Sequence, residues 1–429
     1  MKYNPIEVTL FKTNRKNFTS KLKTNAIAIF NSNDEYLRSG DQTFPFKQNS
    51  DFFYLTGIDQ EQSILFLYPD CPNPLYKEVL FIRQTNEHIA VWEGHKYTKE
   101  QAVDASGILS VYWLEDLWSI VSSVINYSEK IYLNTNENDR FGNEASYRDL
   151  RFINQLKEKY PLHEYHRAAP IMRDLRVIKS EAEVELTNIA CRITGDAFRR
   201  VLRFVRPGVK EYEIEAEIIH EFIKQGATGH AYSPIIASGA NANILHYNDN
   251  NQVCKDGDVI LFDFAAEYAN YNADLSRSIP VNGKFTKRQK DVYKAVLHVM
   301  KEAKKMLVPG TIWNEYHDEV GKIMTDQLIG LGLLSKFDVE RQNLAMPLYK
   351  KYFMHGTSHH LGLDVHDFAS RYKPFEAGNL LTCEPGIYIR EEGLGIRLEN
   401  DILITADGNI DLMADIPIEA EEIEEIMNS

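Results

Sequence analysis

The most constraining feature of the sequence is a pair of acids set into an apolar stretch, residues 257–280, GDVILFDFAAEYANYNADLSRSIP. Asp263 ends an apolar run, and Asp274 follows eleven residues later. If the chain folds back near Tyr268-Ala269, the two acids lie opposite each other on antiparallel strands, on one face. Like charges in that position repel, so a positive group must lie between them, and a divalent metal ion is the simplest candidate.

A second stretch near the C-terminus has the same layout. In residues 378–384 a glycine is followed by a polar residue, an apolar run and, six residues after the glycine, an acid. Gly378 and Glu384 therefore correspond to Gly257 and Asp263. A second acid, Glu399, follows the turn sequence EEG at 391–393, just as Asp274 follows the turn of the first stretch. Two carboxylate hairpins are thus expected in one half of the chain.

A similar helical pattern precedes each hairpin. Helices are expected over residues 180–204 and 211–225, separated by Pro207-Gly208, and again over 292–307 and 313–331, separated by Pro309-Gly310. Ser180 and Glu183 have the spacing of a capping box. The recurrence predicts an internal duplication with a pseudo-twofold axis, which would bring the four acids together at its centre.

The chain is long enough to form two domains. Its 429 residues exceed what a single core usually supports. Residues 1–172 mix short strands and helices, predict an α/β domain and show no catalytic constellation, whereas residues 173–429 carry the hairpins and predict an α+β domain. Buried strands are expected over 26–30, 63–68, 79–82 and 131–133, and the aromatic triplet 52–54 is expected in the core.

Composition and charge restrict the partners and the compartment. A formal net charge of −14 argues against nucleic acid or an anionic membrane as the main partner. The sequence has no secretory signal pattern and no run of about 18 apolar residues. The four cysteines form no CxxC pair, as is typical of reduced thiols, so a cytoplasmic protein is expected. The acidic tail, residues 419–425, is expected to form a short solvated helix and is assigned no function.

Four carboxylates at one centre require about two divalent cations for neutrality. Oxygen-rich ligation favours Mn²⁺, with Fe²⁺, Co²⁺ and Zn²⁺ as competitors. Histidines supply further donors, because four of the thirteen lie within residues 355–366 and His246 lies seventeen residues before Asp263. Clustered histidines that lead towards Glu384 indicate a site. The residue pattern does not distinguish His359 from His360.

These residues resemble the pita-bread metallopeptidases and, among them, the Xaa-Pro aminopeptidases (aminopeptidase P). The motifs that carry the resemblance are His246, Asp263, Asp274, the segment HGTSHHLGLDVHD at 355–367, CEPGIY at 383–388 and RLE at 397–399. Residues 51–57 and 176–180 resemble that family's N-terminal domain and linker. The resemblance therefore covers nearly the whole chain and implies an aminopeptidase P-like domain over 1–172 and a catalytic pita-bread domain with internal duplication over 173–429.

The resemblance also implies a set of metal ligands. Asp263 and Asp274 would bind one metal ion, and Asp274 and Glu399 would bridge to a second ion held by His359 and Glu384. This assignment selects His359 over His360.

Further residues are expected around the metal ions. His246, His355 and His366 would contact the substrate or the ligands, and Arg397 would orient the bridging carboxylate. Tyr388 and Trp92 are expected to bind substrate, Trp92 by packing on proline in a neighbouring subunit's site. The chain would then be a homo-oligomer, a dimer or a tetramer. The other reading of Trp92 is a partly buried structural tryptophan.

The implied reaction releases the N-terminal residue from peptides with proline in the second position. Two cations lower the pKa of a bridging water, and the resulting hydroxide attacks the scissile carbonyl. Glu384 would move a proton from that water to the leaving nitrogen, and His246 or His366 would donate a hydrogen bond to the oxyanion.

Four alternatives remain beside this reading. A prolidase would cleave Xaa-Pro dipeptides with the same centre, but the N-terminal segment and Trp92 favour the aminopeptidase. A methionine aminopeptidase would not need residues 1–172. A creatinase-like hydrolase without metal and a non-catalytic protein-binding module are both disfavoured, because all five ligand positions are present.

Overall fold

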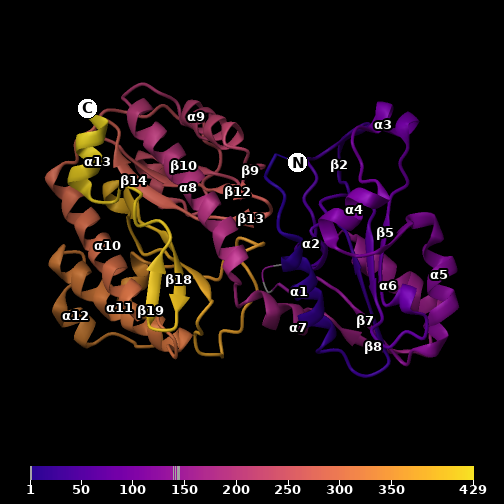
Figure 1. The fold of residues 1–429 in the computed structure, drawn as a ribbon. Coiled ribbons are helices and arrows are strands. Elements are labelled where there is room, and N and C mark those ends of the chain that lie inside the picture. Colours follow the sequence, from indigo (N-terminus) through magenta and orange to yellow (C-terminus); the bar gives the residue numbers. More distant parts are fainter. Residues whose placement is uncertain (1, 139, 141, 143–144) are drawn as a thin grey trace. The chain divides into compact units, whose positions relative to one another are not determined.

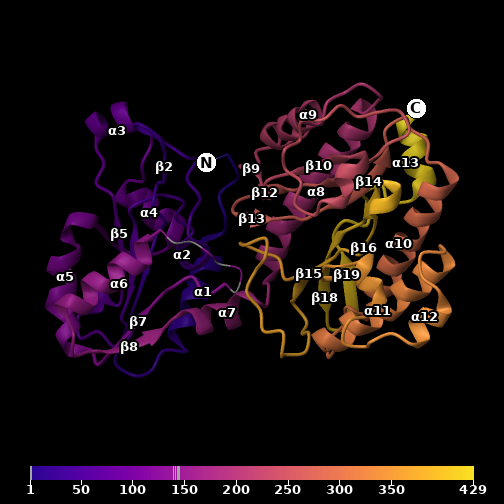
Figure 2. The same ribbon diagram turned by 180° about the vertical axis from the view of Figure 1, so that it is seen from behind.

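The computed structural model describes residues 2–138, 140, 142 and 145–429 (Figures 1 and 2). The chain forms two compact units, one of residues 4–176 and one of residues 177–429 with residues 2–3. The boundary expected before Arg173 falls inside the helix Ala169–Arg176, α7. Among the described residues, no helix is both long and apolar enough to cross a membrane.

The N-terminal unit is built on a six-stranded mixed sheet of order β6-β5-β4-β1-β7-β8. Its strands are β1 Ala26–Asn31, β4 Ile64–Leu67, β5 Glu78–Ile82, β6 Ser110–Trp113, β7 Lys130–Leu133 and β8 Glu164–Arg167. β4 runs antiparallel to β1 and β5, and the other pairs are parallel. The four strands predicted from apolar runs are the four central ones. The two edge strands were not predicted because they carry polar and partly exposed residues. A separate small hairpin joins β2 Leu37–Ser39 and β3 Gln42–Thr43.

Helices pack on this sheet. α5 Leu117–Val124 and α6 Arg148–Lys159 share a core with residues of β1, β4, β5 and β7. α1 Val8–Thr19 packs against α2 Ser50–Thr56, α4 Lys99–Ser106 and α7. The aromatic triplet of α2 is buried, as predicted. Arg176 closes the unit with an ion pair to the buried Asp51 at 2.7 Å. α3 Glu87–Glu93 buries none of its residues.

Two helix pairs frame the strands of the C-terminal unit, α8 Glu181–Phe204 with α9 Glu211–Lys224, and α10 Lys287–Met306 with α11 Trp313–Gly330 (Figure 1). Gly208 and Gly310 follow the first helix of each pair with φ of 96° and 89°, a conformation that suits glycine. α10 begins earlier than predicted because Thr286 and Gln289 form a capping box in front of it. A short helix, α12 Lys336–Glu340, follows α11.

The first hairpin runs from β11 Val259–Asp263 through β12 Ala266–Tyr268 and back through β13 Tyr271–Asn272 and β14 Ser276–Pro280. β10 Ile235–Ser238 flanks β11, and β9 Gly229–His230 flanks β12. Ala269 and Asn270 form the turn, both with positive φ, 51° and 67°. The predicted pairing is wrong: the turn lies one residue later than expected, so Asp263 pairs with Ser276 and Asp274 lies two residues further along the same face.

The second hairpin runs from β15 Leu380–Cys383 through β16 Gly386–Ile389 and back through β17 Leu394–Arg397 and β18 Asn400–Thr405, with β19 Gly408–Asp411 beside β18. Cys383 pairs with Asn400, and the Leu398 amide donates to the Pro385 carbonyl at 3.3 Å. Glu384 and Glu399 are therefore directly opposite in this register. The predicted order of helix, helix and hairpin recurs, so the α+β organisation and the internal duplication expected of this unit are present.

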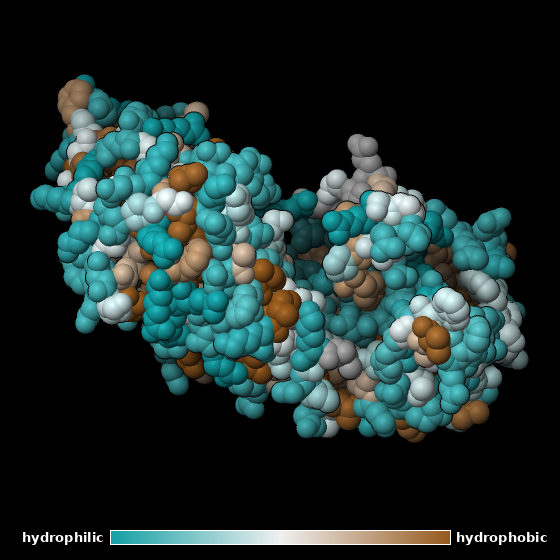
Figure 3. All heavy atoms as spheres, turned by 90° about the horizontal axis from the view of Figure 1, so that it is seen from above, coloured by the Kyte–Doolittle hydropathy of each residue, from teal (hydrophilic) through white to brown (hydrophobic). Residues whose placement is uncertain are grey.

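The acidic tail forms α13 Ala420–Met427, which is not simply solvated. Ala420 and Ile423 are buried, and two acids of the helix, Glu421 and Glu424, pair with Lys290 of α10, Glu424 at 2.9 Å. Elsewhere, Figure 3 shows one largely hydrophilic face, on which apolar residues form small separate groups.

Candidate metal centre

The four predicted acids lie at equivalent ends of strands. Asp263 ends β11 and Asp274 precedes β14, while Glu384 follows β15 and Glu399 precedes β18. His359 comes from an extended segment beside β15, where its carbonyl accepts the Thr382 amide at 2.9 Å. The next residue of this segment forms a bridge to Leu381. Backbone pairing therefore fixes the position of His359 relative to the second hairpin.

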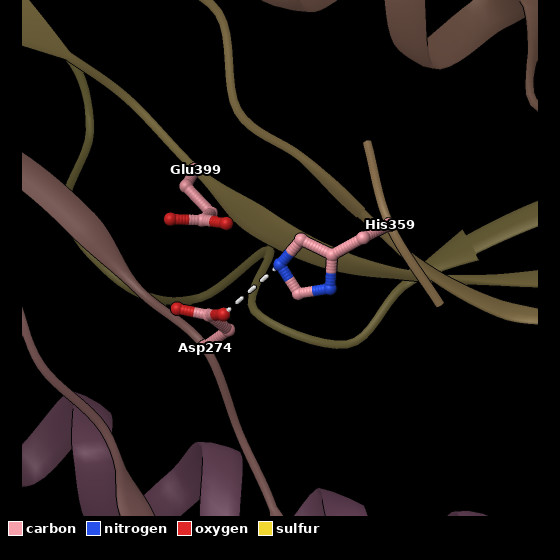
Figure 4. A group of neighbouring side chains, drawn as sticks. All are labelled: Asp274, His359 and Glu399. Carbon is pink, nitrogen blue, oxygen red and sulfur yellow. Dashed lines mark ion pairs between the residues drawn. The ribbon is translucent and has the colours of Figure 1, made fainter. Parts of the chain in front are cut away.

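Asp274, His359 and Glu399 form a group that could hold a metal ion. One ligand atom from each lies within 4.8 Å of the others. Figure 4 shows the imidazole of His359 directed towards the two carboxylates. Its Nε2 lies 3.3 Å from Asp274 and 3.8 Å from Glu384. Its Nδ1 donates to the His360 carbonyl at 3.0 Å, which leaves Nε2 as the donor atom for a metal.

Tyr232 joins the two acids of the first hairpin. Its hydroxyl lies 2.6 Å from Oδ1 of Asp263 and 2.5 Å from Oδ1 of Asp274. A hydroxyl has one proton and can donate it to only one of these oxygens at a time. The hydroxyl oxygen and the two carboxylate oxygens therefore lie close together, and an arrangement of this kind favours a cation.

Arg397 is the buried cation of the site. Its Nη2 donates to Oδ2 of Asp263 at 2.6 Å, and its Nε donates to Oγ of Ser276 at 2.8 Å. Ser276 in turn donates to Oε2 of Glu399 at 2.7 Å. Arg397 was expected to orient Glu399. The direct contact is instead to Asp263, and the link to Glu399 passes through the serine hydroxyl. A third contact, from Nη1 to the Tyr388 hydroxyl at 3.0 Å, fixes the tyrosine.

The electrostatics of the acids favour a cation. Burial raises the pKa of Asp263, although Arg397 offsets part of the effect. Burial raises the pKa of Glu384 to about 7, and burial together with Asp274 raises that of Glu399 well above its ordinary value. Burial alone would lower the pKa of His359, but the hydrogen bond to Asp274 and the charge of Glu384 raise it to about 9. An oxygen-rich, acidic donor set of this kind fits divalent metal ions.

The other predicted histidines lie around this centre in different ways. His355 places Nε2 2.9 Å from the Tyr388 hydroxyl and Nδ1 3.7 Å from Glu384, and burial lowers its pKa to about 3. The ring of His366 lies 4.4 Å from that of His359. His246 is exposed and lines a cavity of about 310 Å³ formed by the loop that follows β10.

His360 points elsewhere. It is buried, and its ring stacks on Trp313 with 5.8 Å between centroids. Burial lowers its pKa well below the ordinary value. The side chain that meets the acids is therefore that of His359. Trp92, on α3 of the N-terminal unit, is 80% exposed, which does not support its reading as a partly buried structural residue.

Two polar residues of the site were missed in the sequence. Ser276 could have been found from the hairpin register, because it is the residue that pairs with Asp263. Tyr232 lies in a loop 31 residues before Asp263, and no local pattern singles it out.

Residues 185–406 match metallopeptidase family M24, and residues 11–132 match the aminopeptidase P N-terminal domain. The chain belongs to metallopeptidase family M24. A Xaa-Pro aminopeptidase of Haemophilus influenzae is 33% identical over 97% of this chain and 97% of its own length. The structure of a putative aminopeptidase P from Bacillus anthracis has a TM-score of 0.91, with 33% identity and 99% of both chains covered. A zinc-substituted Escherichia coli aminopeptidase P, in complex with product, has a TM-score of 0.88, with 31% identity and 99% of both chains covered.

These relatives confirm the resemblance seen in the sequence. The M24 match spans both hairpins and their helix pairs, and the N-terminal match spans β1 to β7. The chain is an M24 metallopeptidase, and the relatives, which are named Xaa-Pro aminopeptidase or aminopeptidase P, do not favour the prolidase alternative. The metal-binding group of Asp274, His359 and Glu399 lies within the M24 segment.

Proposed function

We propose that this M24 chain releases the N-terminal residue from peptides that carry proline in the second position. The observation that carries the proposal is the convergence of Asp274, His359 and Glu399 in a chain whose full-length relative is a Xaa-Pro aminopeptidase. Glu384 lies beside this group, with Oε1 3.8 Å from the ring of His359. The peptide substrate would bind with its scissile bond next to these donors.

We infer that the centre takes two divalent metal ions, and that Mn²⁺ is the native ion. Asp263, Asp274, His359, Glu384 and Glu399 would hold them, and their excess of carboxylate oxygen supports this ion class. When bound, the ions would activate a water molecule and polarise the scissile carbonyl.

The chain's own residues would then move protons and hold the substrate. Glu384, whose pKa is raised to about 7 by burial, is suited to accept a proton and pass it to the leaving nitrogen. Arg397 holds Asp263 in place through its 2.6 Å contact and offsets part of the rise in pKa that burial causes. Tyr388, fixed by Arg397 and His355, would contact the substrate, and His246 or His366 would donate to the oxyanion.

Trp92 would bind substrate in a neighbouring subunit, so the protein would act as a homo-oligomer. The location that we propose for it is the cytoplasm. The 80% exposure of this large apolar side chain on α3 supports the proposal. Trp92→Ala should raise KM for a proline tripeptide while the metal content stays unchanged. Tyr127→Ala, which removes another exposed aromatic ring of the same unit, is the matched control. Unchanged kinetics of the Trp92 variant would refute the role of this residue.

The proposed activity is tested with two matched substrates, an Xaa-Pro dipeptide and an Xaa-Pro-Yaa tripeptide. Release of the N-terminal residue is measured after chelation and again after Mn²⁺ is restored. We expect metal-dependent cleavage of both, faster for the tripeptide. A preference for the dipeptide would make the protein a prolidase. If neither peptide is cleaved while metal is bound, the proposed activity is wrong.

A further inference from the structure

The loop that carries His246 follows β10 and returns to the start of α9. Its residues 239–243 form a short 3₁₀-helix. Residues 244–252, all of them described, form neither helix nor strand. The backbone amide of Glu211 donates to the Gln252 carbonyl at 3.0 Å. The first residue of α9 therefore lies beside the end of the loop.

Glu211 holds this loop at three points through one carboxylate, which is fully buried. Its Oε1 accepts hydrogen bonds from the amide and the hydroxyl of Ser238, at 2.8 and 2.6 Å, where the loop begins. Its Oε2 accepts the hydroxyl of Tyr247 at 2.7 Å and the amide of Gln252 at 2.9 Å. An ionised carboxylate has about four lone-pair sites, so these four hydrogen bonds saturate the side chain.

Tyr247 connects this carboxylate to the surroundings of the metal centre. It is the neighbour of His246 in the chain, and its buried ring belongs to a small apolar cluster that also contains Tyr388. Burial is the main cause of the low pKa of His355, and a positive charge on His246 contributes to it. His246 therefore lies near enough to His355 to act on it electrostatically.

We propose that Glu211 is a positioning residue that fixes His246 beside the metal centre through the hydroxyl of Tyr247. The inference rests on the proposed function, in which His246 is one of two candidate donors to the oxyanion. Ordering a loop without helix or strand costs backbone entropy, and hydrogen bonds to one buried carboxylate offset this cost at the start, the middle and the end of the loop. His246 lies next to the middle point. A displacement of about 1 Å of a group that acts on the transition state can lower the rate about 10²-fold.

A double-mutant cycle between Tyr247 and His246 tests the coupling. Tyr247→Phe removes only the hydroxyl that donates to Glu211. With an Xaa-Pro-Yaa tripeptide and saturating Mn²⁺, this change should lower kcat about tenfold and leave KM nearly unchanged, because an oxyanion donor acts mainly in the transition state. In a His246→Ala background the same change should lower kcat by less than about twofold. Equal factors in both backgrounds, or no loss in Tyr247→Phe, would overturn the proposal.

Glu211→Gln tests the carboxylate itself. The amide keeps one acceptor oxygen and turns its NH₂ group towards donors that the second oxygen now binds, so kcat should fall at least as far as in Tyr247→Phe. Tyr212→Phe and Glu213→Gln, which change exposed side chains of the same helix, are the matched controls and should keep the original kcat. A carboxylate that only stabilises the fold would lower kcat by the same factor with and without His246, and this result would contradict the proposal. If Glu211→Gln does not fold, the cycle with Tyr247→Phe decides alone.

A measurement that needs no turnover separates this inference from the proposed function. The full-length, zinc-loaded protein is prepared with isotopically labelled histidine, and the ring signal of His246 is identified by its absence from the spectrum of His246→Ala. Tyr247→Phe should shift this signal, and Tyr212→Phe should leave it unchanged. If the original protein cleaves no proline peptide but the shift is observed, the proposed function fails while the positioning of His246 is upheld. A His246 signal that does not move in Tyr247→Phe would refute the positioning, whatever the activity.

Discussion

The two hairpins of the C-terminal unit share a framework but place their acids differently. Each keeps a single register along its whole length, from Val259 paired with Pro280 to Tyr268 paired with Tyr271, and from Leu380 paired with Leu403 to Ile389 paired with Leu394. In the second hairpin the two acids face each other. In the first, the residue opposite the acid is Ser276, and Asp274 lies two residues closer to the turn.

This difference makes the two halves complementary. Ser276 occupies the position that corresponds to Glu399, and its hydroxyl donates to Glu399 across the centre at 2.7 Å. The first hairpin also receives the cation, because Arg397 binds Asp263. The acids of the second hairpin have no such direct partner among the arginines and lysines that the structure describes, and burial raises the pKa of both. A duplicated fold thus supplies one acid with a direct arginine partner, Asp263, and a pair of acids without one, although burial raises the pKa of all three.

The largest effect is expected from the second hairpin. Glu384→Gln keeps the shape of the side chain but cannot carry a proton between water and the leaving nitrogen, so kcat should fall about 10³-fold. Metal content, measured by elemental analysis, should be largely retained through the other donors. Glu391→Gln, at the exposed turn of the same hairpin, is the control and should keep full activity. A Glu384→Gln enzyme with normal turnover would remove Glu384 from the mechanism.

The link between the hairpins should have an intermediate effect. Ser276→Ala removes the hydroxyl that joins Arg397 to Glu399 and should lower kcat/KM or metal affinity about 10–100-fold. Ser278→Ala removes a buried hydroxyl of the same strand that hydrogen-bonds to the backbone of Arg397, and this change should have a much smaller effect. If both variants lose kcat/KM or metal affinity to the same extent, the hydrogen-bond link through Ser276 has no specific role at the metal centre.

The uncompensated acids should make the chelated protein less stable as pH rises. Burial moves the pKa of Glu384 from 4.5 to about 7, so the folded state binds more protons than the unfolded state within that window. Stability is then lost as pH rises through it. His359, whose pKa moves from 6.5 to about 9, adds a loss of the same sign at higher pH. Melting temperatures from pH 5 to 9 measure the slope.

The Glu384→Gln variant should flatten this dependence between pH 5 and 7. Added metal should raise the melting temperature most at high pH, where the ligands bind it without releasing protons. A melting temperature of the chelated protein that rises steadily to pH 8, with the same slope in the variant, would contradict the account.

The smallest effect concerns the turn that sets the first register. Asn270 has φ of 67°, a conformation that costs alanine about 1–2 kcal/mol and costs glycine little. Asn270→Ala should therefore lower the free energy of unfolding by about 1 kcal/mol more than Asn270→Gly, which loses the same amide group. Denaturant titration measures the difference. Equal losses would show that the side-chain contacts of Asn270, rather than its backbone conformation, stabilise the turn.

Most of the framework could be predicted from the sequence because its signals are local. Apolar runs identified the four central strands of the N-terminal unit, and the Pro-Gly pairs marked the ends of α8 and α10. The spacing of glycine, apolar run and acid identified both hairpins. The family resemblance, and not the residue pattern, distinguished His359 from His360. The turn of the first hairpin was predicted one residue too early, at Tyr268-Ala269 instead of Ala269-Asn270, because Asn270 takes the left-handed conformation more readily than Tyr268.

The sequence by itself determined which four acids lie on the two hairpins, because strand period and motif spacing are properties of neighbouring residues, whereas the choice of His359 came from the family resemblance. Only the tertiary structure decided how the acids are compensated. Tyr232 reaches Asp274 across 42 residues, Ser276 reaches Glu399 across 123, and Arg397 reaches Asp263 across 134. Such contacts depend on how two hairpins pack against each other, and no local pattern encodes them.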